Sequence, residues 1–134
     1  MPMSAQRAQL KTAVANKLRK PWQHDIYCEL CKRNPATDLH EHWISRGQST
    51  GNMALQQAIL NSMYNVSLLC NDCNINHAET EENRKLLRRA SVERYGVLTI
   101  LLWMDSLPFR SEVDRAQHKR EVNNIYEEMQ NEPK

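Results

Sequence analysis

Two Cys-x-x-Cys pairs constrain the fold of this chain more strongly than any other feature. All four cysteines of the sequence fall in these pairs, as Cys28, Cys31, Cys70 and Cys73. Thiolates two residues apart can bind one face of a tetrahedral zinc ion, and two such pairs complete a structural site of four sulfurs. Disulfides or plain buried thiols are the alternatives, but no secretory signal pattern precedes the first pair, so we expect a reducing, cytoplasmic compartment. We therefore predict structural Zn²⁺ bound by all four cysteines.

The length and composition predict one mainly helical domain. The chain has 134 residues with only 3 glycines and 1 phenylalanine, a composition that disfavours a sandwich or a barrel. A net charge of +2 neither demands nor excludes nucleic acid as a partner. No apolar stretch approaches the roughly 20 residues that span a bilayer, so we expect a soluble protein with no membrane partner.

Local patterns around the cysteines predict two strands and a helix, flanked by further helices. In chain order we expect a helix over residues 4–20 that Pro21 ends, a strand over 37–44, a mobile polar loop over 45–52, a helix over 53–63, a strand over 65–69 and a helix that starts near Asp72. Strand, loop, strand and helix around a metal is a ββα pattern. The single domain then comprises an N-terminal helix within residues 1–24, a zinc-bound core over 25–80 and a helical extension over 81–134.

Beyond the fourth cysteine every pattern indicates helix. Thr80 is the expected N-cap of a helix that Gly96 ends. Residues 97–104 are apolar on nearly every face and predict a core helix, with a homodimer interface as the alternative. Ser111 and Asp114 form a capping signal for the last helix. Its imperfect apolar stripe consists of Val113, Ala116, Val122, Ile125, Tyr126 and Met129.

A histidine-rich segment lies between the cysteine pairs, and an asparagine follows the second pair. The order is Cys-x-x-Cys, Leu39-His40-Glu41-His42, Asn65-Val66-Ser67-Leu68-Leu69-Cys70 and Cys73-Asn74. This order resembles the HNH, or ββα-metal, endonuclease family, and residues 68–74 are similar to the junction-resolving phage endonuclease VII type. The resemblance covers residues 27–78. It implies an antiparallel hairpin plus a helix stapled by zinc, DNA as the partner, and a small phage-encoded member of the family.

The resemblance implies catalytic roles for the histidine-rich segment in two alternative registers. In the first register His40 binds a divalent ion and Glu41 occupies the place of the base histidine, for which His42 can substitute. In the second register Glu41 is the ligand and His42 is the base. We favour His42 as the base, because near pH 7 a neutral imidazole accepts a proton from water more readily than an unperturbed carboxylate does.

The resemblance also implies roles for residues that follow. Asn65 fixes the loop between the strands through side-chain to backbone hydrogen bonds, and Asn74 binds the catalytic ion, which is Mg²⁺, Mn²⁺ or another divalent ion. His77 is a further ligand or a phosphate contact, or else an ordinary surface histidine. The implied function is hydrolysis of DNA phosphodiester bonds by a water that a histidine activates. The alternative is a non-catalytic zinc module that binds DNA or protein.

Six basic side chains are candidates for phosphate contacts, with solvated helix faces as the ordinary alternative. They are Arg33, Arg46, Arg84, Lys85, Arg88 and Arg89. His24 and His118 have no partner pattern, so we assign them no role. Trp43 is predicted to pack in the core instead of contacting DNA.

Overall fold

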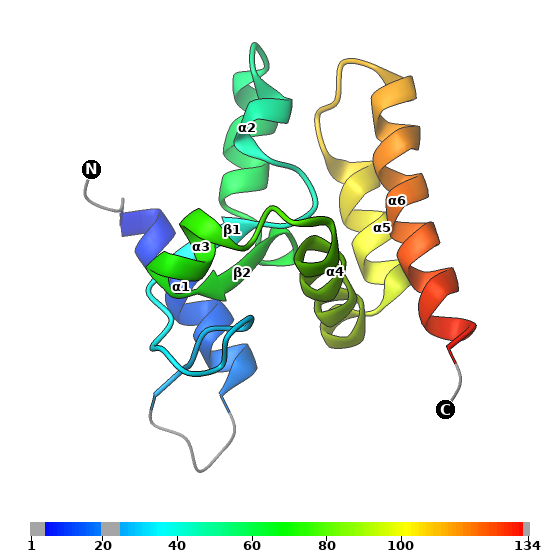
Figure 1. Ribbon diagram of the computed structural model, residues 1–134. Helices are drawn as coiled ribbons and strands as arrows, with labels where there is room; N and C mark the ends of the chain where they lie inside the picture. The colour runs from blue at the N-terminus through cyan, green and yellow to red at the C-terminus, as the bar shows by residue number, and fades with distance from the viewer. Residues whose placement is uncertain (1–4, 20–24, 133–134) are drawn as a thin grey trace.

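The described part of the chain forms six α-helices, two strands and two short 3-10 helices. The structure is a computed structural model that describes residues 5–19 and 25–132. In chain order the elements are α1 (Ala5–Leu18), β1 (Asp38–Glu41), η1 (Arg46–Ser49), α2 (Met53–Leu60), η2 (Met63–Asn65), β2 (Val66–Leu69), α3 (Asn71–Asn76), α4 (Glu81–Tyr95), α5 (Val97–Ser106) and α6 (Glu112–Gln130). The molecule is therefore mainly helical with one small antiparallel sheet, as predicted (Figure 1).

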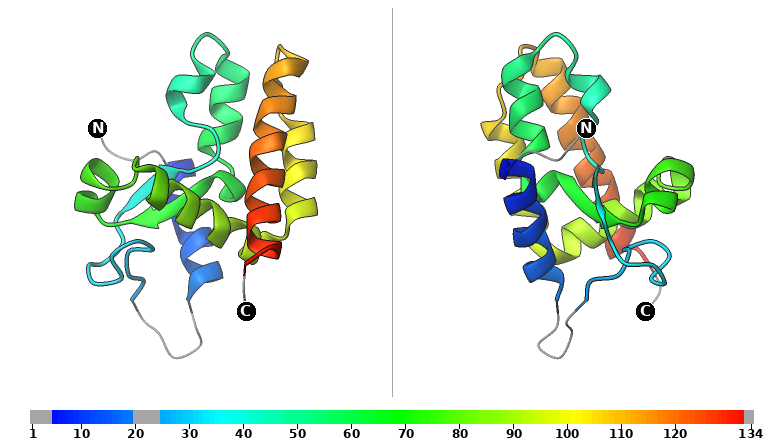
Figure 2. Two further views of the ribbon diagram at one scale, coloured as in Figure 1. Left: turned by 45° about the vertical axis from the view of Figure 1, so that its right-hand side comes forward. Right: turned by 90° about the vertical axis from the view of Figure 1, so that its left-hand side faces the viewer.

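The two-stranded sheet lies between α1 and α3. Its register places His40 of β1 opposite Ser67 of β2. Successive side chains of a strand point to opposite faces, so Leu39 packs with Leu10 of α1 while His40 faces the other way. Asn74 of α3 meets His40 on that second face, and the right-hand view of Figure 2 shows α1 and α3 on opposite sides of the strands. The alternation along β1 thus directs Asp38 and His40 toward α3, and Leu39 and Glu41 toward α1.

The largest apolar core joins α2 to the C-terminal helices. Its buried members come from the segment after β1, from α2, and from α4 to α6. They are Trp43, Ile44, Leu55, Ile59, Val92, Ile100, Met104, Leu107, Val122 and Ile125. Burial of one large apolar side chain contributes roughly 1.5–3 kcal/mol, so this cluster fixes α2 against the α5–α6 pair beside it in Figure 1. Trp43 is a core residue, as predicted.

Capping residues set the ends of the later helices where the sequence predicts them. At the start of α4, Asn83 N donates to Thr80 Oγ1 at 3.2 Å. Gly96 ends α4 with a φ of 87°, which favours glycine. Before α6, Asp114 N donates to Ser111 Oγ at 3.3 Å. These local contacts confirm the predicted caps.

The earlier elements are present but shorter than predicted. The strand expected over residues 37–44 is limited to β1, because the backbone then turns into the loop that Asn65 fixes. The helix expected over residues 53–63 ends at Leu60, and a 3-10 turn precedes β2. The N-terminal helix is confirmed as α1. Pro21 and His24 lie outside the described residues.

Residues 45–52 differ from the prediction of a mobile polar loop. They include η1, whose capping box consists of Gln48 N donating to Ser45 Oγ at 3.3 Å and Ser45 N donating to Gln48 Oε1 at 2.9 Å. Ser49 is buried, and its hydroxyl donates to Arg46 O at 2.7 Å. The segment is ordered by these local hydrogen bonds, which a composition-based interpretation overlooks.

Only one face of α5 belongs to the core. Ile100 and Met104 are fully buried, whereas Leu98 is 72% exposed and Leu102 is 67% exposed. Three residues assigned to the apolar stripe of α6 are also exposed, so their assignment is wrong; they are Val113, Ala116 and Tyr126. A homodimer through this region stays a prediction, for which Leu98 and Leu102 provide the apolar surface. No helix among the described residues is long and apolar enough to cross a bilayer.

Candidate metal centre and the neighbouring histidine site

The four cysteines converge on one cluster, as their spacing predicts. Their Sγ atoms all lie within 4.8 Å of one another, and those of Cys31 and Cys70 are 3.9 Å apart. Zinc–sulfur bonds of about 2.3 Å in a tetrahedron separate the sulfurs by about 3.8 Å, so the cluster fits a four-sulfur zinc site. None of the four forms a disulfide. Within residues 5–19 and 25–132, they are the only group of three or more His, Cys, Asp or Glu side chains placed to hold one metal ion.

A tight turn after Cys28 presents the first pair of thiols. Cys28 N donates to Asn34 O at 2.8 Å, and Lys32 N donates to Cys28 O at 3.0 Å. Lys32 takes up a φ of 59° to close this turn. Hydrogen bonds from the backbone of Asn34 and Arg33 lower the pKa of the Cys31 thiol to about 6. The thiolate is the form that binds metal, so the turn prepares Cys31 as a ligand.

The start of α3 presents the second pair of thiols. Cys70 is the N-cap of α3, and Cys73 N donates to Cys70 Sγ at 3.5 Å. This backbone hydrogen bond is the main reason that the pKa of Cys70 is lowered. Burial raises the pKa of Cys73. A coordinating cation deprotonates a thiol outright, so zinc in the cluster would overcome the burial of Cys73.

Glu29, inside the first Cys-x-x-Cys pair, ties the cysteine turn to β2 and α4. Its carboxylate accepts hydrogen bonds from Leu68 N at 2.6 Å and from Arg94 Nη2 at 2.6 Å. The side chains of Glu29 and Arg94 are only 9% and 12% exposed. Sequence reasoning missed this contact, because Glu29 and Arg94 lie 65 positions apart and no local pattern connects them.

Polar side chains from β1 and α3 meet on the face of the sheet that α1 does not cover. His40 Nδ1 and Asn74 Oδ1 are 3.0 Å apart. Asn74 Nδ2 donates to Asp38 Oδ2 at 3.1 Å, and His40 Nε2 lies 3.5 Å from Glu79 Oε1. Burial would raise the pKa of Asp38, but side-chain hydrogen bonds, first from Asn71, lower it overall. An imidazole, an amide oxygen and two carboxylates therefore gather where β1 meets α3.

The separation of His40 and Asn74 fits two adjacent ligands of a six-coordinate ion. Ligand bonds of about 2.1 Å at right angles place two donor atoms about 3.0 Å apart. His40 would coordinate through Nδ1 in its neutral form, with the proton on Nε2 beside the Glu79 carboxylate. These two residues alone leave the other coordination positions to water or to a phosphate.

His42 directly follows β1, two residues after His40, and its side chain is buried. His42 Nδ1 is 2.7 Å from Ser67 Oγ, and His42 Nε2 is 3.0 Å from Tyr64 O. A carbonyl oxygen only accepts, so Nε2 carries the proton and Nδ1 accepts from the Ser67 hydroxyl. Burial is the main cause that holds the pKa of His42 well below its usual 6.5. His42 is thus neutral with both nitrogens occupied, which does not fit the water-activating role that sequence reasoning favoured for it.

Glu41 points away from His40, toward α1. Its Oε1 lies 3.9 Å from Arg7 Nη2, and the Arg7 guanidinium also donates to Leu60 O. Burial is the main cause that lowers the pKa of Arg7; the Glu41 carboxylate opposes this lowering and the positive charge of Arg46 adds to it. The end of β1 therefore has the His40 imidazole on the α3 side and the Glu41 carboxylate, with Arg7 as its cationic neighbour, on the α1 side.

Asn65 fixes the loop after β1 through four hydrogen bonds to the backbone. Its Oδ1 accepts from Trp43 N at 3.1 Å and from Ile44 N at 2.9 Å. Its Nδ2 donates to Ile44 O at 2.9 Å and to Ile59 O at 3.1 Å. The side chain is fully buried. These are the loop-fixing contacts that the resemblance implies for Asn65.

His77 is placed apart from the His40 and Asn74 pair. Its imidazole is exposed, and His77 Nε2 lies 3.4 Å from Asp72 Oδ2 on the outer surface of α3. This geometry agrees better with the surface-histidine interpretation than with a further metal ligand.

Most of the basic candidates on α4 are held by acidic side chains. The ion pairs are Arg84 with Glu79, Lys85 with Glu81 and Glu128, and Arg89 with Glu132. Arg88 is only 11% exposed; its Nε donates to His42 O at 2.7 Å, and its guanidinium lies 5.3 Å from the centre of the Trp43 ring. Arg88 is therefore an internal contact and does not fit the predicted phosphate-binding role. Arg33 and Arg46 are exposed, with no ion pair among the described residues.

His118 has a structural environment that sequence reasoning did not anticipate. It is 7% exposed and stacks on Phe109 with ring centres 5.5 Å apart. His118 Nδ1 lies 3.7 Å from Glu121 Oε2. The spacing of three residues between His118 and Glu121 is a helical pairing signal that was available in the sequence.

Comparisons with known proteins do not identify a relative. No protein-family model, no curated protein and no solved structure matches the chain. The geometry and chemistry of these residues are therefore the basis on which a function can be inferred.

Proposed function

We propose that the protein is an HNH-type, metal-dependent DNA endonuclease, a phosphodiester hydrolase with structural zinc. The observation that carries the proposal is the 3.0 Å separation of His40 Nδ1 and Asn74 Oδ1. In the first register that the resemblance implies, these two residues bind the catalytic divalent ion. A divalent ion such as Mg²⁺ or Mn²⁺ supplies charge neutralisation at the scissile phosphate and the leaving oxygen when it is bound there.

The order of the elements supports this proposal. Two antiparallel strands are followed at once by α3, and the cysteine cluster lies where β2 enters α3. In a ββα-metal nuclease, such an arrangement would hold the ligand of the first strand against the ligand of the helix. The contact between His40 of β1 and Asn74 of α3 is consistent with that arrangement.

The environments of Glu41 and His42 favour the first register. The second register needs Glu41 as ligand and His42 as base, but Glu41 faces α1, away from His40, and His42 has no free nitrogen. Arg46 is exposed and its charge acts on Arg7, so Arg46 would bind a phosphate of a DNA strand near the end of β1. We therefore propose His40 and Asn74 as the ligands of the divalent ion, as in the first register, and assign the base to neither Glu41 nor His42.

Plasmid nicking by the zinc-loaded protein tests the proposal. With Mg²⁺ or Mn²⁺ present, the wild type should nick the plasmid, and His40→Ala and Asn74→Ala should each lose roughly 100-fold or more of the rate. Asn76→Ala is the matched control, because Asn76 is an exposed asparagine on the same helix that contacts Asp72. Equal rates for Asn74→Ala and Asn76→Ala with retained zinc would contradict the assigned ligands.

A non-catalytic zinc module for DNA or protein binding is the second candidate. Two observations favour it: both nitrogens of His42 are occupied, and the Glu41 carboxylate is paired with Arg7. Such a module binds DNA or a protein without a divalent ion at His40. If DNA binds equally well with and without Mg²⁺ and no metal supports nicking, this candidate replaces the nuclease.

A further inference from the structure

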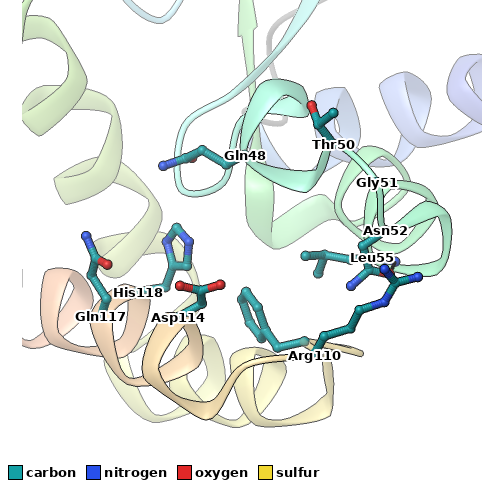
Figure 3. A pocket seen from close by; sticks show the side chains of 10 residues that line it. Gln48, Thr50, Gly51, Asn52, Leu55, Arg110, Asp114, Gln117 and His118 are labelled. Atoms are coloured by element: carbon teal, nitrogen blue, oxygen red, sulfur yellow. Dashed lines mark hydrogen bonds between the residues drawn. The ribbon is translucent and has the colours of Figure 1, made fainter.

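A pocket lies between the η1–α2 segment and the start of α6, and none of the proposed catalytic residues lines it. Its volume is about 390 Å³, within the range of pockets that hold small ligands. Figure 3 shows that Asp114, Gln117 and His118 enter it from α6, while Gln48, Asn52 and Leu55 come from the opposite segment. The pocket is therefore a meeting point of two segments that are far apart in the sequence.

The pocket combines an apolar surface with polar groups of both kinds. Leu55 is buried and Phe109 is half-buried, and both line the pocket. The Gln48 carboxamide oxygen is used by Ser45 N, which leaves the Gln48 amide N–H groups to donate. The Asp114 carboxylate accepts no hydrogen bond and forms no ion pair among the described residues. A planar ligand with an apolar face and a polar edge matches this combination.

Arg110 adds a positive charge at the same pocket. Its side chain is exposed and has no ion-pair partner in the described part of the chain. In Figure 3 it extends from the start of α6 toward Asn52. Arginine binds phosphate through bidentate, charge-assisted hydrogen bonds. The pocket thus offers separate places for a planar base and for an anionic group.

A buried polar chain connects this pocket to the end of β1. His118 Nδ1 lies 3.7 Å from Glu121 Oε2, and the same oxygen lies 3.6 Å from Arg88 Nη2. Arg88 Nε in turn donates to His42 O at 2.7 Å. Neither His118 Nδ1 nor Glu121 Oε2 has a hydrogen-bond partner in the described structure. The pocket wall is therefore linked by three contacts to His42, in the segment that directly follows β1.

We propose that this pocket binds one unstacked nucleotide of a DNA substrate. The base lies against Leu55 and Phe109, with its polar edge at Asp114 and Gln48, and its phosphate contacts Arg110. This inference rests on the proposed function, because DNA is then the substrate. Unstacking one base costs a few kcal/mol, least in a bulge or a single strand, so the pocket would favour DNA with an unpaired nucleotide.

Calorimetric titration with the four deoxynucleoside monophosphates tests the inference on the full-length, zinc-loaded protein without added Mg²⁺ or Mn²⁺. At least one nucleotide should bind, and Arg110→Gln and Asp114→Asn should each weaken its binding about tenfold. Arg120→Gln and Glu127→Gln are matched controls, because both side chains are exposed on α6 outside the pocket. Both control variants should bind as the wild type does.

Absence of nucleotide binding at millimolar concentration would overturn the inference, and so would equal affinities for wild type, Arg110→Gln and Asp114→Asn. Binding of free amino acids or short peptides, without nucleotides, would also overturn it. Failure of the proposed function is distinguishable, because His40→Ala should leave nucleotide affinity unchanged. A protein that binds nucleotides in the pocket but never nicks DNA would keep this inference and lose the nuclease. A protein that nicks DNA with unchanged binding in both pocket variants would do the reverse.

Discussion

The cysteine-bearing segment and the C-terminal helices are stabilised in different ways. Around α3 the buried cluster combines three cysteines with Leu69, Ala78 and Leu87. The core between α2 and α5–α6 instead contains large side chains such as Trp43 and Ile100. Apolar burial stabilises the second region, whereas the cluster around α3 contains fewer large apolar side chains and would gain more stability from a bound metal ion. The comparison predicts that a metal ion at the cysteine cluster stabilises mainly the part of the molecule that carries the candidate site.

Charged side chains show a second difference between the same regions. On α4, Arg84, Lys85 and Arg89 face acidic partners, so much of their charge is compensated within the molecule. In the first region, Arg33 and Arg46 have no such partners among the described residues. A run of basic residues in the sequence is therefore a weaker indicator of a nucleic-acid-binding surface than an exposed basic side chain that has no acidic partner.

Zinc removal should have the largest effect, and it should destabilise the cysteine-bearing region more than the C-terminal helices. Structural zinc contributes on the order of 10 kcal/mol to the folding of small metal domains. After chelation, or in Cys28→Ser, backbone amides of residues 25–79 should lose hydrogen-exchange protection while those of α5 and α6 keep more of it. Readdition of zinc to the wild type is the control. Equal loss of protection throughout the chain would contradict the division.

Glu29→Gln should destabilise the protein by about 3–5 kcal/mol, because it leaves the buried Arg94 guanidinium without its charge partner. Chemical denaturation of the zinc-saturated protein measures this change. The double variant Glu29→Gln, Arg94→Met removes both charges and should lose less stability than the single variant. A double variant that is less stable than Glu29→Gln would contradict the assigned contact.

The pH dependence of stability should reveal the buried, neutral His42. The pKa of folded His42 is held below its usual value of 6.5, chiefly by burial, so below about pH 6.5 the unfolded chain binds a proton that the folded chain refuses. The contribution of neutral His42 to the unfolding free energy is therefore fully present above pH 6.5. It is lost as the pH falls from 6.5 toward the lower pKa of the folded state. The expected slope is up to roughly 1.4 kcal/mol per pH unit.

Denaturation of wild type and His42→Gln between pH 5 and 7, both saturated with zinc, measures this contribution. The wild type should lose more stability on acidification than His42→Gln, which does not titrate. The shared protonation of the cysteines affects both proteins equally. Identical pH profiles would show that His42 is accessible to protons, and it would then return as a candidate base.

Lys85→Met should have the smallest effect, within about 0.5 kcal/mol, because its ion pairs with Glu81 and Glu128 are on the surface. Thermal unfolding at low and high salt measures the change. A loss comparable to that of Glu29→Gln would show that surface ion pairs on α4 stabilise the helical region as strongly as the buried pair stabilises the cysteine turn.

Features that depend on neighbouring residues were predictable from the sequence. The spacing of Cys28 and Cys31 predicts the metal cluster, and Thr80 and Ser111 predict helix starts, because each signal acts within one turn. The capping box of Ser45 and Gln48 was equally local, but the polar composition of residues 45–52 obscured it. Short-range chemistry thus accounts for the elements of the fold.

Features that depend on distant partners were not predictable. The role of His42 depends on Ser67 and Tyr64, which lie across the sheet, and a sequence pattern does not show that both of its nitrogens are used. Arg88 similarly looks like a surface cation until its contact with His42 O is known. Two histidines separated by one residue can therefore have opposite roles, one facing α3 and one closed in the interior.

Mn²⁺ binding, followed by electron paramagnetic resonance on the zinc-loaded protein, tests the central claim most directly. The account predicts one Mn²⁺ site per chain, distinct from the zinc, that is lost in His40→Ala and Asn74→Ala but retained in Asn76→Ala, with zinc content unchanged in all three. Mn²⁺ binding that is absent from the wild type, or that persists undiminished in His40→Ala, would contradict a divalent-ion site at His40 and Asn74.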